Sequence, residues 1–366
     1  MTRFDLRLRH PSGETPISIG DGVLAAESGD LQEWVRQRRV FVISSPSVLE
    51  LHSSALVSLS EQAGSWQILE VPDGEDAKSV DVAADLWARM LEAGGKRDSG
   101  VIAFGGGSVG DLGGFVAGNF MRGLEYVQLP TTLLAQVDAA VGGKTAVNLP
   151  QAKNSVGLFH HPERVVAETR FLKTLPDAEL RSGLMEVLKM AVICDPELFS
   201  MLERDLDRLL EGDAAMLAPV VAAAVRGKID IVERDPMEAN ERMLLNLGHT
   251  LGHALEASLD YQSLRHGEAV GYGILFAVRL AAQRGFSEES AGRIRQLVER
   301  FDLPRIQAPD AETLLRLIRR DKKVGEAGWR WVLPVELGNC KVVSGLAESV
   351  VRHELETFLA QLETTS

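Results

Sequence analysis

Short runs of β-branched and other apolar residues alternate with helical periodicity through the first half of the chain. The apolar runs occupy residues 39–43, 66–71 and 100–104, and residues 80–93 carry apolar side chains at helical intervals. Because parallel strands need a crossover connection, usually a helix, this alternation predicts an α/β domain with a largely parallel, Rossmann-like sheet. Ligands of such sheets bind at the carboxyl ends of the strands.

The pattern changes near Leu175, where long helical periods with few strand signals begin, as in residues 179–193. The chain has 366 residues, more than a single hydrophobic core usually holds, so two domains are expected. We predict an N-terminal α/β domain over residues 1–174 and a mostly α-helical C-terminal domain over residues 175–366.

The formal net charge of -13 argues against a nucleic-acid binder or a protein held on acidic lipid, since both need a basic surface. An anionic substrate must therefore meet a local basic cluster. Cys194 and Cys340 form no CxxC pair, so we expect buried free thiols rather than a disulfide framework. The sequence has no apolar stretch of about 18 residues and no secretory signal pattern, so we expect no membrane contact and a cytoplasmic location.

A glycine-rich turn, residues 105–111 with the sequence GGGSVGD, follows the third apolar run. Its G-x-G-x-x-G spacing before a helical pattern predicts nucleotide binding, because glycine lets the backbone approach a pyrophosphate at a helix N-terminus. A tight turn without a ligand is the alternative. The turn is not the first strand–helix junction, and no carboxylate stands about 20 residues further on, so the site would differ from the usual dinucleotide pocket.

One face of a helix predicted over residues 241–257 carries polar side chains at intervals of four, three and four residues: Arg242, Asn246, His249 and His253. A solvated face is normally filled by Lys and Glu, so these residue types favour a functional site. Histidines at i and i+4 also occur in zinc proteases, but the glutamate of H-E-x-x-H is replaced here by threonine, which weakens that interpretation.

A second predicted helix carries Glu186 and Lys189 inside an apolar run, where an unpaired charge would be expensive. They are either a satisfied ion pair or residues of a site, and spacing alone does not choose. A third histidine, His266, precedes another apolar helix, and mixed His and Glu ligation with an open position suits catalytic zinc. Together with a basic cluster of Arg122 and several lysines, these parts predict a site for a nucleotide, a metal and an anion.

Several segments together resemble the 3-dehydroquinate synthase family, in the right order and over most of the chain. They are the glycine turn and residues 130–138 (PTTLLAQVD), 142–148 (GGKTAVN), 153–154 (KN), 246–253 (NLGHTLGH), 266–270 (HGEAV) and 321–323 (DKK). The resemblance implies a homodimer whose N-terminal domain binds NAD+ and whose helical domain binds Zn2+, which Co2+ can replace. The active site would lie between the domains.

The activity implied by the resemblance belongs to the shikimate pathway of aromatic amino acid biosynthesis. The substrate would be a small anionic sugar-acid phosphate, 3-deoxy-D-arabino-heptulosonate 7-phosphate, and the products 3-dehydroquinate and phosphate. Transient oxidation by NAD+, phosphate elimination, reduction and intramolecular aldol closure would follow one another on the same bound molecule.

Family roles transfer to the matching positions of this chain. Zinc would be held by Glu186, His249 and His266. NAD+ would contact Glu75, Lys78, Gly105, Gly106, Gly107, Ser108, Val109, Asp111, Thr131, Thr132, Asp138, Lys144, Lys153 and Thr174. The catalytic residues would be Lys144, Lys153, Asn154, Lys189 and His253. Further substrate contacts would be Arg122, Lys228, Arg242, Asn246 and one of Lys322 or Lys323.

The chain departs from the family pattern at Ser44 and Ser45, where members usually carry an aspartate that holds the adenosine, and at Met185, where a small residue is common. A related cyclase making 2-deoxy-scyllo-inosose or a valiolone is the nearest alternative, but Lys228 and Arg242 resemble the family's carboxylate contacts and argue against it. An NAD- and metal-dependent polyol dehydrogenase, which would release NADH, and a non-catalytic regulator with the same fold are the others.

Overall fold

The computed structural model describes residues 2–27, 29–259, 263–307, 309–321 and 329–364. These residues form two compact units, the first comprising Met1–Pro176 with Glu211–Met237 and the second Asp177–Leu210 with Glu238–Ser366. The sequence predicts one boundary after residue 174, whereas helix α9 (Ala214–Arg234) returns to the first unit. It does so because its apolar face packs on strands β1 and β2 of that unit.

A seven-stranded sheet forms the centre of the first unit, in the order β1-β2-β9-β6-β5-β3-β4. The strands are β1 (Arg3–His10), β2 (Gly13–Gly20), β3 (Arg39–Ser44), β4 (Ser65–Glu70), β5 (Gly100–Gly105), β6 (Glu125–Pro130) and β9 (Arg164–Glu168). Only the β1–β2 pair is antiparallel among these described strands. The predicted α/β domain with a largely parallel sheet is therefore confirmed.

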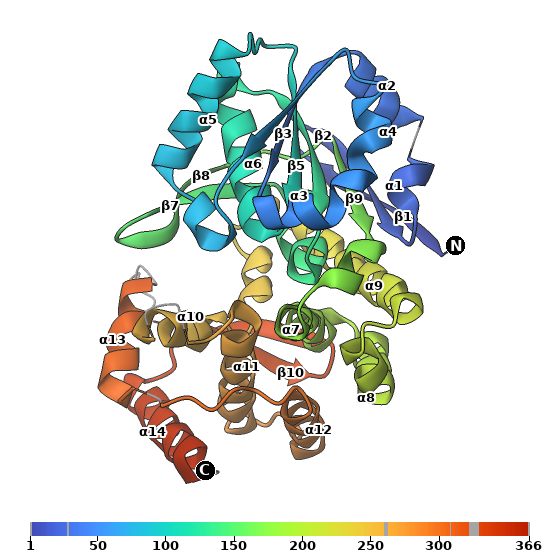
Figure 1. Ribbon diagram of the computed structural model, residues 1–366. Coiled ribbons are helices and arrows are strands. Elements are labelled where there is room, and N and C mark those ends of the chain that lie inside the picture. Colours follow the sequence, from blue (N-terminus) through green and yellow to red (C-terminus); the bar gives the residue numbers. More distant parts are fainter. Residues whose placement is uncertain (1, 28, 260–262, 308, 322–328, 365–366) are drawn as a thin grey trace. The chain divides into compact units, whose positions relative to one another are not determined.

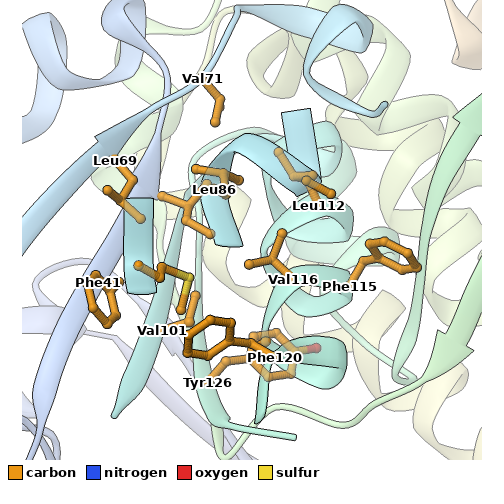
Figure 2. Packing of buried hydrophobic residues seen from close by; sticks show 14 of the residues in the cluster. Phe41, Leu69, Val71, Leu86, Val101, Leu112, Phe115, Val116, Phe120 and Tyr126 are labelled. Carbon is orange, nitrogen blue, oxygen red and sulfur yellow. The ribbon is translucent and has the colours of Figure 1, made fainter. Parts of the chain in front are cut away.

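Helices cover both faces of this sheet, as parallel strands require (Figure 1). On one face lie α5 (Val80–Glu92) and α6 (Gly107–Asn119). On the other face lie α1 (Val23–Ala26), α2 (Asp30–Arg36) and α4 (Val57–Ser60). The short elements α3 (Pro46–His52) and η1 (Ser53–Leu56) come between α2 and α4 in the sequence. In Figure 2, Leu86 of α5 and Val116 of α6 lie beside Phe41 and Val101 of the sheet. The predicted crossover helix at residues 80–93 is confirmed as α5.

Short elements complete the first unit and carry many of the candidate site residues. They are η2 (Gly74–Ala77), η3 (Phe120–Arg122), the single-turn π-helix η4 (Ala135–Ala139), the hairpin of β7 (Lys144–Leu149) with β8 (Ala152–Phe159), and η5 (Thr169–Thr174). Residues of the hairpin's second strand are mostly exposed. Its lysines are therefore accessible to a ligand.

The second unit is mostly helical, as predicted. It contains α7 (Asp177–Cys194), α8 (Pro196–Leu210), η6 (Glu241–Asn246), α10 (His249–Ser258), α11 (His266–Ala282), α12 (Glu288–Glu299), α13 (Ala311–Asp321) and α14 (Glu348–Thr364), with the antiparallel pair β10 (Arg330–Glu336) and β11 (Asn339–Ser344). Most side chains of α7 are buried, on every face of the helix. Helix α11 packs against α7, α10, α12 and α14. None of the helices that the structure describes is long and apolar enough to cross a membrane.

One predicted helix is wrong. Residues 241–257 form the 3-10 helix η6 and then α10, separated by Gly248 in a left-handed conformation at φ 79°. A Cβ at Gly248 would lie 2.7 Å from the carbonyl oxygen of Val270 on α11, so only glycine permits this close turn. Arg242 and Asn246 therefore do not share a continuous helical face with His249 and His253.

Candidate active site

The strand order of the first unit reverses direction beside the glycine turn. From β3 the chain moves outward to β4, then returns across β3 to β5 and continues to β6 on the other side. Such a switch point leaves a crevice at the carboxyl ends of the two adjacent strands, where doubly wound sheets bind their ligands. Here those ends are Ser44 of β3 and Gly105 of β5.

The predicted glycine turn joins β5 directly to α6. A Cβ at Gly105 would lie 2.7 Å from Cβ of Val109, so glycine is required for the chain to enter the helix this tightly. Gly106 is the N-cap of α6 and offers no side chain to the first helical N–H groups. Those N–H groups can therefore donate to a bound anion such as a pyrophosphate, and the positive end of the helix dipole favours its charge.

Four of the predicted NAD-contacting residues surround this turn in one polar network. Nζ of Lys78, which is buried, donates to Oδ2 of Asp111 at 2.7 Å and also hydrogen-bonds Asn154. Oγ of Ser108 donates to Glu75 at 2.9 Å. Burial raises the pKa of the Asp111 carboxyl, against the opposing effect of Lys78. Residues from η2, α6 and β8 are thus brought together, although they are far apart in sequence.

Asn148 belongs to the same network and was missed by the sequence analysis. Its Nδ2 donates to Glu75 at 2.8 Å, and its Oδ1 accepts from the backbone N–H of Asn154 at 2.8 Å. The second bond holds Asn154 at φ 51°, a left-handed conformation that asparagine tolerates better than most residues. The position of Asn148 inside the motif GGKTAVN was the signal that could have identified it.

Asp138 and Lys228, predicted for NAD+ and for substrate, form an ion pair in the first unit. Nζ of Lys228 on α9 donates to the backbone oxygen of Asp138 at 2.7 Å and to its Oδ1 at 2.5 Å. Lys228 is buried while Asp138 is partly exposed. The immediate role of Lys228 is therefore to fix Asp138 at the π-helix η4.

The remaining candidates of the first unit are more scattered. Thr131 and Thr132 follow β6, where the N–H of Thr131 donates to the carbonyl of Gly105 at 2.9 Å. Thr174 instead contacts Nε2 of His52 at 2.9 Å. The remaining three are exposed and lie on η3 or the β7–β8 hairpin: Arg122, Lys144 and Lys153.

Three predicted metal ligands converge inside the second unit, from α7, α10 and α11. Oε1 of Glu186 lies 3.6 Å from Nε2 of His266 and 4.0 Å from Nε2 of His249. Glu186 is 1% exposed, and among the described residues its Oε1 finds no hydrogen-bond partner. A buried carboxylate oxygen in this situation is costly unless a cation completes the site.

The histidine rings are oriented for ligation through Nε2. Nδ1 of His249 lies 3.1 Å from the carbonyl of Leu247, to which it can only donate, so the Nε2 lone pair is available. Burial lowers the pKa of His249, and the charge of Lys189 lowers it further, which favours the neutral ligand form. For His266, burial acts in the same direction but the hydrogen bond to Glu256 and the charge of Glu186 prevail and raise the pKa. The three residues therefore fit a divalent cation with an open coordination position.

Lys189 answers the question that spacing left open. Its ammonium group pairs with Oε2 of Glu186 one helical turn away, and both side chains are almost fully buried. The two residues form a satisfied ion pair, and the same carboxylate keeps Oε1 for a cation. Glu186 and Lys189 are therefore an ion pair within the candidate site.

The other predicted residues of the second unit lie on η6 and α10. His253 is one turn after His249, and their rings meet edge to face with centroids 5.2 Å apart. Arg242 is buried, and Nδ2 of Asn246 donates to Glu238 at 3.4 Å. Lys322 and Lys323 lie outside the described residues. Glu256, also on α10, was missed, although an acidic residue seven positions after His249 was visible in the sequence.

Comparison with known proteins decides the family. Residues 68–182 match the family model described as 3-dehydroquinate synthase N-terminal, and residues 183–324 match 3-dehydroquinate synthase C-terminal. The chain belongs to the 3-dehydroquinate synthase family. A 3-dehydroquinate synthase from Symbiobacterium thermophilum is 41% identical over 349 residues, which cover 94% of this chain and 97% of the relative. Another member of the family, from Vibrio atlanticus, is 39% identical over 93% of this chain and 95% of its own.

Solved structures of other enzymes show a similar fold. A 2-epi-5-epi-valiolone synthase from Streptomyces hygroscopicus, solved with NAD+ and Zn2+ bound, has a TM-score of 0.86 at 28% identity and covers 96% of this chain and 97% of its own. A 2-deoxy-scyllo-inosose synthase has a TM-score of 0.88 at 23% identity, covering 97% and 100%. An iron-containing alcohol dehydrogenase follows at 0.70 and 15% identity, over 94% and 97%. The last two likenesses concern the fold alone.

Proposed function

We propose that the protein converts 3-deoxy-D-arabino-heptulosonate 7-phosphate to 3-dehydroquinate and phosphate, using NAD+ and a divalent metal. The observation that carries this proposal is the buried Oε1 of Glu186 facing the Nε2 atoms of His249 and His266 in a chain of this family. Zn2+ suits the mixed carboxylate and imidazole set, and Co2+ can replace it.

Arg242 supports a substrate that carries a carboxylate. Arg242 is 2% exposed, and a buried guanidinium is well suited to binding a carboxylate through charge-assisted hydrogen bonds. Lys228 contributes less to this choice than the sequence indicates, because its ammonium group already donates twice to Asp138. The preference over cyclases of uncarboxylated sugar phosphates therefore depends on Arg242.

The residues of the chain have separable tasks in the reaction. When bound, NAD+ would accept a hydride and return it, and the metal would act as a Lewis acid at an oxygen of the substrate. Lys144, Lys153 and Arg242 would hold the anionic groups by charge-assisted hydrogen bonds. His253, whose ring touches that of His249, would transfer protons at the substrate. The Lys189 ammonium would hold the Glu186 carboxylate in position through their ion pair.

The assembly and the location are part of the same proposal. As the family resemblance implies, we expect a homodimer. The net charge of -13 and the lack of a secretory or membrane-spanning sequence pattern lead us to expect action in the cytoplasm, with no nucleic acid or membrane as partner. Light scattering after gel filtration tests the assembly: a dimer has twice the chain mass of 39.8 kDa. A particle of the single-chain mass at working concentration would reject it.

One assay tests the activity against its rivals. The protein is incubated with the heptulosonate phosphate, a divalent metal and substoichiometric NAD+, and phosphate and NADH are followed together. We expect many phosphates released per NAD+ without net NADH, because oxidation and reduction take place on one bound molecule. NADH equal to product would support a polyol dehydrogenase instead. Phosphate release only from sugar phosphates lacking a carboxylate would support a related cyclase, and no turnover by the metal-loaded protein would support a regulator.

A further inference from the structure

Glu256 on α10 is a buried carboxylate without a role in the reaction described above. It is 7% exposed, and it lies three residues after His253 and seven after His249, on the same side of the helix. Burying a carboxylate is expensive unless a hydrogen bond or an opposite charge compensates it. One partner that the structure provides is His266, the first residue of α11.

The His266 ring lies between two carboxylates, one at each nitrogen. Oε2 of Glu256 is 3.5 Å from Nδ1, and Oε1 of Glu186 is 3.6 Å from Nε2. Only Oε1 of Glu186 also faces His249, and it finds no hydrogen-bond partner among the described residues. The cation is therefore expected on the Nε2 side, which leaves Nδ1–H to donate to Glu256.

The backbone at His266 is fixed independently of Glu256. The N–H of Gly267 donates to Oγ of Ser182 at 2.9 Å, and the carboxylate of Glu268 accepts from the N–H of Arg265 at 2.7 Å. These bonds hold the first turn of α11 but leave the imidazole free to rotate about its side-chain torsions. Rotation by half a turn about the Cβ–Cγ bond would put Cδ2 and Cε1 in the places of Nδ1 and Nε2, so the ring itself needs a separate anchor.

A competing arrangement uses Glu256 as a ligand. His253, Glu256 and His266 also each offer one ligand atom within 4.8 Å of the others. A cation held there would use Nδ1 of His266 and would leave the buried Oε1 of Glu186 uncompensated. The arrangement through Nε2 satisfies both carboxylates, so the structure favours it.

We propose that Glu256 is a positioning residue for the metal site, an inference that rests on the metal dependence of the proposed function. Its carboxylate accepts the Nδ1–H of His266, fixes the ring and its tautomer, and makes Nε2 a stronger ligand. Outer-shell carboxylates of this kind typically change metal affinity by about 10–100-fold.

The test compares three variants of the full-length protein. Glu256→Ala removes the acceptor, and Glu256→Gln keeps an acceptor oxygen without the charge. Glu354→Gln is the control, because Glu354 is another buried carboxylate and pairs with Arg279 of α11, thirteen residues after His266. The Zn2+ affinity of each metal-free protein is measured by competition with a chelator, in the absence of NAD+ and substrate. We expect a loss of about 10–100-fold for Glu256→Ala, a smaller loss for Glu256→Gln and wild-type affinity for Glu354→Gln. Wild-type affinity in folded Glu256→Ala would overturn the proposal.

A measurement on the wild-type protein keeps the proposal testable even where Glu256→Ala does not fold. Nitrogen NMR of the zinc-loaded protein, with His266 assigned by its substitution, reports which ring nitrogen carries the proton. We expect Nδ1–H, and a proton on Nε2 would reject the proposal in favour of ligation through Nδ1. Zinc binding without phosphate release would reject the proposed function and leave this inference standing, so the two failures are distinguishable.

Discussion

His253 and His266 lie close together, but we propose different roles for them: His266 binds the metal, and His253 transfers protons at the substrate. Their ring centroids are 6.2 Å apart, yet only His266 faces Oε1 of Glu186. His253→Ala is expected to keep its zinc and lose about 10²–10⁴-fold in turnover, as expected for a proton-transfer group. His266→Ala is expected to lose zinc, since two protein ligands hold the ion weakly.

Metal content and phosphate release measured on both purified variants check this expectation. Retention of zinc by His266→Ala together with its loss from His253→Ala would contradict the ligand set and favour a histidine pair on one helix. The two variants also distinguish the ligand pair that helical spacing suggests, His249 with His253, from the set that the structure brings together. His249 and His253 share α10, whereas the second proposed histidine ligand, His266, comes from α11.

Arg242 is expected to act on the substrate rather than on NAD+. Arg242→Met should weaken binding of the carboxylated substrate by about 1.5–3 kcal/mol, the usual contribution of a hydrogen bond to a charged group. Arg242→Lys is the control, because it keeps the charge but loses the planar donor pair. Calorimetric titrations with the heptulosonate phosphate and with NAD+ check the difference. Equal weakening of both ligands would assign Arg242 to folding of the second unit instead.

At the scale of elements, the break between η6 and α10 places His249 at the first position of its helix. Gly248→Ala should both strain the backbone at φ 79° and push on Val270 of α11, the helix that carries His266. We expect loss of zinc affinity and a loss of unfolding free energy above the roughly 1–2 kcal/mol that a left-handed alanine costs by itself.

Gly285→Ala is the matched control for this variant. Gly285 has φ 89°, but a Cβ there would meet no atom within 4 Å. It should therefore cost only the backbone strain and leave zinc binding unchanged. Chemical unfolding and chelator competition on both variants give the comparison. Equal effects at the two glycines would show that backbone strain alone, and not the contact with α11, matters at Gly248.

At the scale of the whole molecule, the described candidate residues are divided between the two compact units. The glycine turn and its polar network belong to the first, and the three proposed metal ligands belong to the second. Removal of the metal by a chelator should therefore abolish phosphate release but leave NAD+ affinity unchanged. Restored zinc should also stabilise the protein, by about 2.7 kcal/mol at a hundredfold excess over its dissociation constant. Calorimetry with NAD+ before and after chelation checks this, and loss of NAD+ binding with the metal would contradict it.

The sequence by itself determined the class of each unit and most of the residue types of the site. The alternation of strand and helix patterns depends on residues a few positions apart, and so does the apolar run around Glu186. Both can therefore be recognised within short windows of sequence. The family resemblance added a predicted ligand set, which spacing alone could not choose. Only the tertiary structure decided that α9 belongs with the sheet and that Gly248 divides a predicted helix in two. It also decided that Glu256 meets His266, because contacts between distant helices depend on how these helices pack, which no local pattern records.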